Sequence, residues 1–292
     1  MNRHHIKIVL LLFCTLHCWA EQRYPASGLV VSIDLPRKMV TLSCESIPGY
    51  MDAMVMPLRV RDHNILGELK PGMMVDFSLV VEKDSSYADQ VRVHAFQSAE
   101  QDPFTAHQLK NLAALVAPDS SRTTPLSVGQ PVPDFHLTDQ NRQTVTLSQF
   151  SGKVVAINFI YTRCALPQFC FRLTNNLARL QSRFARVLGR DLILLTITFD
   201  PIHDQPDILA NTAKTWKADV RTWHFLTGTL PDIRKACGLF GVDAWNDDGL
   251  MIHSLHTVII DRKGRLAANL EGNQFTAKQL GDLVEGVIHS NE

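Results

Sequence analysis

The sequence predicts an α/β domain preceded by a small all-β barrel. Short apolar strands with alternating polarity fill residues 28–96, and no helical pattern separates them. From Val128 onward, apolar strands alternate with amphipathic helices, which is the pattern of an α/β sheet. The chain has 292 residues, which is long enough for two ordinary domains.

The charge pattern argues against nucleic acid as a partner. The chain has 29 basic and 29 acidic residues, so the formal charge is balanced. No basic stripe or arginine-rich run occurs. A nucleic-acid-binding domain normally shows such a feature.

Residues 1–20 are typical of a secretory signal. Arg3 and Lys7 precede a short apolar run that ends in Cys-Trp-Ala, which predicts cleavage after Ala20. The run is short for a membrane span. We therefore expect an exported, periplasmic protein, with membrane association through an uncleaved leader as the alternative.

The first folded region is predicted at residues 24–97. Its strands lie in the segments "GLVVSIDLPRKMVTLSC", "MPLRVRD", "MMVDFSLVVEK" and "ADQVRVHAF", and Pro71-Gly72 forms a turn. Five short strands in about seventy residues favour an OB-type barrel. Residues 98–127 contain one short helical pattern and then Pro, Ser and Thr, which predicts a linker.

Residues 128–292 follow the element order of a thioredoxin-like fold. Strands are predicted in "VVAINFIYT" and "LILLTITFD", and helices in "FRLTNNLARLQSRFARVL", "PDILANTAKTWK" and "LPDIRKACGLFG". A hairpin in "HTVIIDRKGRLAANLEG" and a helix in "TAKQLGDLVEGVIHS" complete the domain.

Cys164 and Cys170 lie where a predicted strand passes into a helix. Such loops at the carboxyl ends of strands are where α/β sheets place their sites. A cysteine at a helix N-terminus has a lowered pKa, and its thiolate is both a nucleophile and a soft-metal ligand. A stabilising disulfide is the third possibility, although closing so short a loop removes little chain entropy.

His253 and His256 come just before an apolar strand, on the edge of the sheet that carries the thiol loop. Two thiolates and one imidazole suit Cu(I), Cu(II) or zinc. His256 is the weaker candidate because it can begin the strand itself. Asp200 ends a strand at the same edge and is expected to support the site from behind its ligands, and Asp204 is expected to cap the next helix.

A second candidate site lies in the barrel. Met54 and Met56 are two residues apart, so an extended strand points both to one face. Met51 precedes them and Cys44 ends the previous strand. Thioethers and a thiolate suit Cu(I), whereas methionines alone are also common as core packing. Cys237 recurs with apolar residues at helical spacing and is expected in the core.

The region from about Gln130 resembles the Sco/SenC family of exported thioredoxin-like copper proteins. The matching segments are "VPDFHLTDQNRQTVTLSQFSGKVVAINFIYTRC", "FDPIHDQPDIL", "WHFLTG" and "HSLHTVIIDRKGRL". The resemblance implies that Cys164, Cys170 and His253 bind copper. The family usually has three residues between its cysteines, whereas this chain has the five residues "ALPQF", and Phe171 replaces the usual proline.

Residues 28–96 resemble the small copper-binding barrels of the CusF type, on the segment "GYMDAMVMPLRV". Cys44 stands at the usual histidine position and Met51 at the usual aromatic one. This resemblance implies that the barrel binds copper, and the resemblance to Sco/SenC implies a copper chaperone for the dinuclear copper site of cytochrome c oxidase, with a subunit of that enzyme as partner. An enzyme is the alternative: a thiol–disulfide oxidoreductase in which Cys164 and Cys170 form the redox pair. A purely structural disulfide domain with an inert barrel is a third reading.

Overall fold

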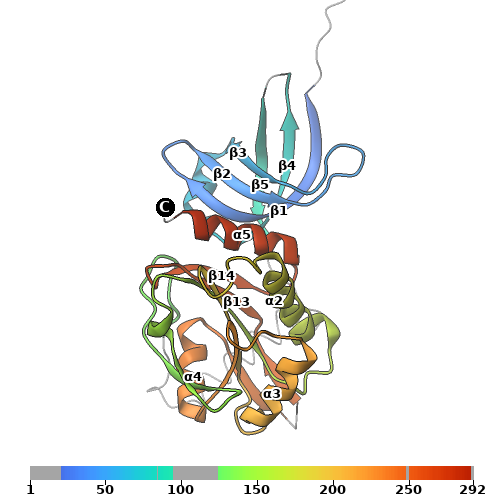
Figure 1. Cartoon of the computed structure of the whole chain (residues 1–292). Helices are drawn as coiled ribbons and strands as arrows, with labels where there is room; N and C mark the ends of the chain where they lie inside the picture. The colour runs from blue at the N-terminus through green and yellow to red at the C-terminus, as the bar shows by residue number, and fades with distance from the viewer. Residues whose placement is uncertain (1–20, 84, 95–123, 248–249, 291–292) are drawn as a thin grey trace, which may run out of the picture.

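The computed structural model describes residues 21–83, 85–94, 124–247 and 250–290, and these residues form two parts joined through one helix (Figure 1). A barrel lies at one end and an α/β sheet at the other. Helix α5 (Ala277–His289) lies between them. The predicted fold class, a thioredoxin-like α/β domain preceded by a small all-β barrel, is confirmed.

Five strands close the barrel in the order β1-β2-β3-β5-β4. They are β1 (Gln22–Asp34), β2 (Met39–Cys44), β3 (Val55–Val60), β4 (Met74–Val81) and β5 (Ser86–Val93). A 3₁₀ helix, His63–Gly67, leads from β3 toward β4. Alternation directs every second side chain inward, so Leu58 and Val60 are buried while Arg59 is exposed.

The second part is built on a sheet in the order β14-β13-β8-β9-β10-β6-β7. Its strands are β6 (His136–Asp139), β7 (Thr144–Thr146), β8 (Val154–Ile160), β9 (Leu192–Thr198), β10 (Trp223–Thr227), β13 (His256–Ile260) and β14 (Leu266–Glu271). The central strands β8, β9 and β10 are parallel. Every residue of β8 and β9 is buried, because helices or loops cover both faces of the sheet.

Helices cover the two faces of this sheet unequally. Helices α2 (Arg172–Arg183), α3 (Pro206–Thr215) and α5 contribute to one apolar cluster, and α4 (Leu230–Leu239) contributes to another on the opposite face. A separate hairpin pairs β11 (Ala244–Asp247) with β12 (Leu250–His253). Cys237 is buried in the α4 cluster, as predicted.

The barrel packs directly on α5. Leu29 of β1 belongs to the same buried cluster as the α5 side chains. The Ser43 hydroxyl donates to an Asp282 carboxylate oxygen at 2.6 Å, and the Gln279 amide donates to the Ser43 carbonyl oxygen at 3.2 Å. The apolar contact is therefore continuous with the core of the α/β part. The buried hydrogen bonds that join Ser43 to Asp282 and Gln279 form a polar seam between the two parts.

Several predictions of the sequence analysis lie outside the described residues. These are the leader at residues 1–20 and most of the linker at 98–127. Within the described part of the chain, no helix has the length and apolar character needed to cross a membrane. The predicted hairpin at residues 256–272 and the C-terminal helix are both present, as β13–β14 and α5.

Candidate metal centre

The thiol loop follows the buried strand β8 directly. A single turn, Pro167–Phe171, separates the loop from α2 and carries Cys170. Cys170 is buried at 4% exposure, while Cys164 is half-buried at the surface of the α/β part. The strand fixes the first thiol and the turn folds the second back toward it, so five intervening residues still bring both sulfurs together.

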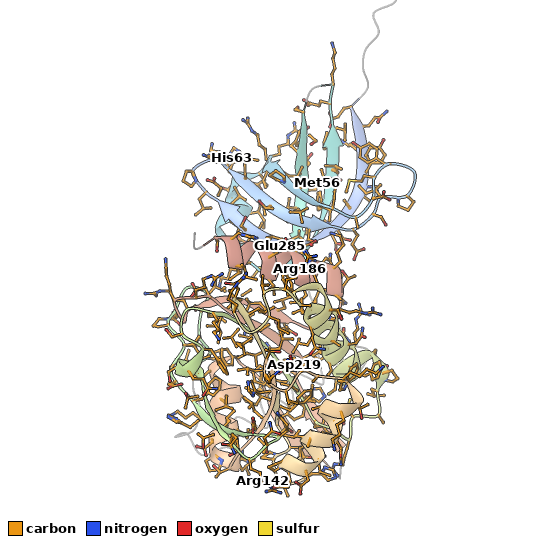
Figure 2. All side chains as sticks on the ribbon, in the orientation of Figure 1. Met56, His63, Arg142, Arg186, Asp219 and Glu285 are labelled. Atoms are coloured by element: carbon orange, nitrogen blue, oxygen red, sulfur yellow. The ribbon has the colours of Figure 1, made fainter. Side chains whose placement is uncertain are left out.

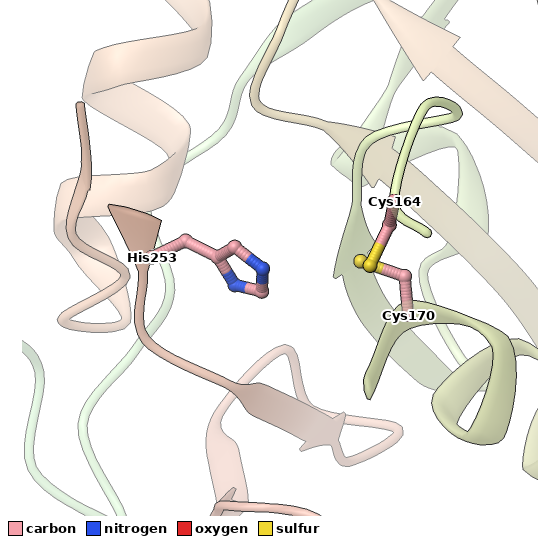
Figure 3. A group of neighbouring side chains, drawn as sticks. All are labelled: Cys164, Cys170 and His253. Carbon is pink, nitrogen blue, oxygen red and sulfur yellow. The ribbon is translucent and has the colours of Figure 1, made fainter. Parts of the chain in front are cut away.

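His253 reaches the same place from the β11–β12 hairpin. The two sulfur atoms and a ring nitrogen of His253 all lie within 4.8 Å of one another. Figure 3 shows the imidazole directed toward the paired sulfurs from the facing strand. The Nδ1 atom lies 3.0 Å from the carbonyl oxygen of Ser254. Because a carbonyl can only accept, Nδ1 carries the hydrogen, and Nε2 presents its lone pair as the ligand atom.

Aromatic rings that were not predicted from the sequence surround the His253 imidazole. The ring centroids of Phe199, Tyr161 and Phe169 lie 4.7, 5.6 and 6.5 Å from that of His253. These residues hold the imidazole in place and reduce its access to water. Tyr161 could have been noticed, because it ends the strand that leads to Cys164. Phe199 and Phe169 come from separate segments, and nothing in their spacing points to His253.

The two thiols differ in their electrostatic surroundings. A hydrogen bond from the Cys170 thiol is the largest effect on the pKa of Cys164, which is lowered to about 4. The pKa of Cys170 is raised, because its proton is held by Cys164 and because the side chain is buried. The metal-free pair therefore carries one thiolate, on Cys164, at neutral pH. Two sulfur donors and one imidazole form a set that suits copper or zinc and does not suit magnesium or calcium.

Asp200 supports the loop through Arg163, the residue before Cys164. The carboxylate of Asp200 is buried at 6% exposure, and its Oδ2 accepts from the Arg163 guanidinium at 2.6 Å. Asp200 therefore lies behind the thiol loop and stays outside the group of three candidate ligands. This placement fits its predicted supporting role.

The prediction that Asp204 caps the following helix is wrong. The N-cap position of α3 is Gln205, and its side chain makes no capping bond. Asp204 is instead fully buried and accepts hydrogen bonds from the Thr162 backbone N–H and from the hydroxyls of Thr162 and Thr198. Asp200, His203 and Asp204 lie close enough to share a cation, but Asp204 is already saturated by these donors. Its role is to anchor the start of the thiol loop.

His256 does not join the site. It is the first residue of β13 and is buried at 6% exposure, and its Nδ1 lies 2.9 Å from the side-chain oxygen of Asn269. Its place at the start of the strand, which made it the weaker candidate in the sequence, is confirmed. The described cysteines carry free thiols, so Cys164 and Cys170 are present here as a dithiol.

The candidate residues of the barrel are partly brought together. The Cys44 N–H donates to the Met54 carbonyl oxygen at 2.9 Å, and Met56 pairs with Leu42 across the β2–β3 ladder. Met54 is exposed at 48%, whereas Met56 and Met51 pack against the barrel core (Figure 2 labels Met56). Burial raises the pKa of the Cys44 thiol to about 11, so Cys44 stays protonated without a metal.

The fold and the site together define a class: a thioredoxin-like domain whose loop dithiol faces one histidine. A family model described as SCO1/SenC matches residues 124–288, which is more than half of the chain. The chain therefore belongs to the SCO1/SenC family. A second model, described as copper binding periplasmic protein CusF, matches residues 23–93. These matches confirm copper as the metal predicted from the sequence.

Individual relatives are distant. Protein sco1 of Schizosaccharomyces pombe is 27% identical over 154 residues, which cover 50% of this chain and 56% of that protein. The SCO1 protein homolog of Bacillus subtilis is 28% identical over 97 residues, covering 33% and 49%. The chain thus spans about half the length of these curated relatives.

Solved structures match the α/β part. A candidate electron transfer protein of Aquifex aeolicus VF5 is 22% identical with a TM-score of 0.50, covering 57% of this chain and 99% of that one. Yeast Sco1 is 25% identical with a TM-score of 0.46, covering 56% and 96%. At 22% identity, the likeness to the Aquifex protein bears on the fold alone.

Proposed function

We propose that this chain is an exported copper chaperone that holds Cu(I) through Cys164, Cys170 and His253. The observation that carries the proposal is the convergence of two sulfurs and one imidazole nitrogen within 4.8 Å of one another. These donors come from two separate segments of the chain. A structural disulfide would need no imidazole beside it.

Transfer of the metal is by ligand exchange between soft donors and needs no general base. Cys164 is half-buried and carries the thiolate, so an incoming thiolate from a partner can displace it first. Cys170 lies deeper and is held on the turn before α2. The order of exchange therefore follows from exposure: Cys164 releases the metal before Cys170 does.

The barrel is proposed as a second copper-binding domain. Met54 and Met56 would be its thioether ligands, with Met51 and the buried Cys44 beside them. Thioethers bind Cu(I) without losing a proton. Cys44 would bind only if the metal displaced its proton, which burial makes costly.

The client and the compartment are proposed from relatives. One solved relative is described as a member of the Sco family of cytochrome c oxidase assembly proteins, another is a Bradyrhizobium japonicum protein with copper bound, and a third is a Bacillus anthracis lipoprotein. The CusF description names a periplasmic protein. We infer that this chain is likewise exported and supplies copper to a subunit of cytochrome c oxidase.

Copper stoichiometry of the reduced full-length chain tests this proposal. The unmodified chain should bind one Cu(I) in each part. Cys164→Ser with Cys170→Ser should remove the copper of the α/β part, and Met54→Leu with Met56→Leu should remove that of the barrel. Leucine keeps the size of methionine, so the second pair should cost less than about 1.5 kcal/mol of stability. Full copper occupancy in the first double variant would refute the proposed site.

The thiol asymmetry favours a second candidate function, reduction of a client disulfide. The Cys164 thiolate would attack the disulfide, forming a mixed disulfide and releasing one client thiolate. Cys170 would then transfer its proton and attack Cys164, releasing the second client thiol and leaving a Cys164–Cys170 disulfide. An external dithiol would have to regenerate the pair. In this function His253→Ala should alter reduction rates modestly, whereas in the copper function it should greatly weaken metal binding.

A further inference from the structure

We propose that a cationic groove between α2 and the first turn of α5 binds an acidic segment of a partner protein. The groove is defined here by Arg172, Asn176, Arg179, Arg183, Thr276 and Lys278. The binding of an acidic segment does not depend on copper. Its use in docking a copper-exchange partner does rest on the proposed function.

The groove is built from one face of α2. Arg172, Asn176, Arg179 and Arg183 follow one another at spacings of four, three and four residues, which places all of them on one side of a helix. Leu173, Leu177 and Leu180 lie on the adjoining side of the helix, about a quarter of a turn away, in the core. This side of α2, called the stripe below, therefore carries three guanidinium groups and one amide.

This stripe faces α5 across an open cavity of about 560 Å³. Figure 1 shows α2 next to α5, and the Arg183 guanidinium donates to Asp282 at 2.8 Å. The stripe from Arg172 to Arg183 spans about 16 Å at the rise of an α-helix. That length matches roughly five residues of extended chain and exceeds a single phosphate group.

The cations of the groove are not fully neutralised. Arg183 and Lys278 share Asp282, and Arg183 also reaches Glu285. Arg172 donates to the carbonyl oxygens of Gln274 and Phe275. The Arg179 guanidinium has no ion pair or hydrogen bond with any residue of the described ranges. Two positive charges are therefore left without a carboxylate.

A buried donor at the groove also lacks a partner. Asn176 is 4% exposed, and its side-chain Nδ2 finds no acceptor among the described residues. An unpaired buried amide costs free energy unless a ligand accepts from it. Asn176 lines the cavity, so a carboxylate seated between the arginines would supply this acceptor once the amide turned toward the cavity.

The N-terminus of α5 also attracts an anion to the groove. Thr276 accepts from the Gln279 N–H, while the Ala277 and Lys278 N–H groups belong to the first turn, which has no intrahelical acceptor. The N-terminal end of a 13-residue helix also carries a partial positive charge. Donors from the helix end and from the stripe therefore favour an anionic ligand, and the length of the stripe favours an extended acidic segment over a single small anion.

The position of the groove explains what the binding would achieve. Arg172 is two residues beyond Cys170, and Asn273, just before α5, donates to the Gln168 carbonyl oxygen in the thiol loop. An acidic segment held on the stripe would place its protein beside Cys164 and Cys170. Guanidinium groups suit this task because they bind carboxylates with two parallel hydrogen bonds.

The test uses the reduced, metal-free full-length chain and fluorescein-labelled hexaglutamate, followed by fluorescence anisotropy at low and moderate salt. We expect saturable binding that weakens as salt rises. Arg179→Gln should weaken binding at least about tenfold, because a charge-assisted hydrogen bond is lost. Asn176→Leu should also weaken it, although the net charge is unchanged. Arg221→Gln is the matched control, since Arg221 is exposed and paired with Asp219 away from the groove.

Three results would overturn the proposal. The first is no saturable binding at low salt, and the second is equal weakening by Arg179→Gln and Arg221→Gln, which would mean general charge attraction. The third is displacement of hexaglutamate by inorganic phosphate of equal affinity, which would mean a small-anion site. The Cu(I) affinity of Arg179→Gln, measured separately, should be unchanged, so failure of the groove and failure of the copper site remain distinguishable.

Discussion

Cys164 and Cys170 share one loop but carry different charges, because the Cys170 proton serves the Cys164 sulfur as a hydrogen bond. The pKa of Cys164 is lowered to about 4, whereas burial raises the pKa of Cys44 to about 11 and of Cys237 to about 12. One thiol of the described four is therefore ionised at neutral pH. The reactivity of the thiols toward alkylating reagents should follow this difference in pKa.

Alkylation of the reduced, metal-free chain tests the assignment of charge. Iodoacetamide should modify Cys164 first, and its rate should change little between about pH 6 and about pH 8, since the thiolate is formed well below this range. An ordinary thiol would react about 100-fold faster at the higher pH. Mass spectrometry of the modified peptides gives the site. A steep rise with pH, or first modification at Cys170, would contradict the assignment.

His253 supplies the one donor that distinguishes a metal centre from a redox pair. His253→Ala should weaken Cu(I) binding by at least about 100-fold, because one of three ligands is lost. The far-ultraviolet circular dichroism should be unchanged, since the side chain is half-buried beside aromatic rings that remain. Competition with a Cu(I) chelator measures the affinity. His136→Ala, an exposed histidine of β6, is the control, and equal affinities of the two variants would exclude His253 as a ligand.

At the scale of elements, the C-terminal helix is specialised for contact with the barrel. Gly286 is in α5, where alanine is normally the better residue by about 1 kcal/mol. A Cβ atom at this position would lie 2.8 Å from Cγ1 of Val31 in β1. Valine is stiff at χ1, so this methyl group cannot easily move aside. The glycine therefore permits the close approach of α5 to the barrel.

Gly286→Ala should consequently lower the free energy of unfolding by about 1–3 kcal/mol, where propensity alone would raise it. Urea denaturation of the full chain measures the change. Gly67→Ala is the control, because nothing lies within 4 Å of its added Cβ, and it should be close to neutral. A stabilised Gly286→Ala chain would show that the barrel does not press on α5.

The helices and strands could be predicted from the sequence more fully than the side-chain contacts between them. Periodicity placed α5 and the β13–β14 hairpin, because their apolar spacing is local information. The same reasoning brought Cys164, Cys170 and His253 to one edge, since strand ends and flanking loops share that edge. It assigned Asp204 to a cap, because Thr162, whose backbone N–H and hydroxyl bind Asp204, lies 42 residues earlier in the chain. Phe199 was missed for the same reason: its partner His253 is distant in sequence.

At the scale of the whole molecule, the barrel is part of the structural support of the α/β part. Leu29 from the barrel completes the cluster that contains Leu270, and Ser43 satisfies the buried Asp282. The sequence suggested two independent domains on a linker, and it held no signal for this seam. Contacts between residues more than two hundred positions apart produce no periodic pattern in the sequence.

A chain reduced to residues 124–292 should therefore be less stable than the full chain. Uncovering Leu270 and losing Leu29 removes about 2–4 kcal/mol of apolar burial. The thermal midpoint should fall by about 5–10 °C. Differential scanning calorimetry makes the comparison, and the full chain should unfold in one transition. An unchanged midpoint for the shortened chain would mean that the seam contributes no stability.

We expect the two thiols to form one redox-gated clamp for copper. The most direct measurement is the Cu(I) affinity of the full chain, by chelator competition, in the dithiol form and after oxidation to the Cys164–Cys170 disulfide. A thiolate is a charged soft donor, whereas a disulfide sulfur carries no charge. The α/β part should bind Cu(I) tightly only in the reduced chain, and both Cys164→Ser and Cys170→Ser should lose this binding. Equal affinity in the two redox states, or full binding by either serine variant, would contradict it.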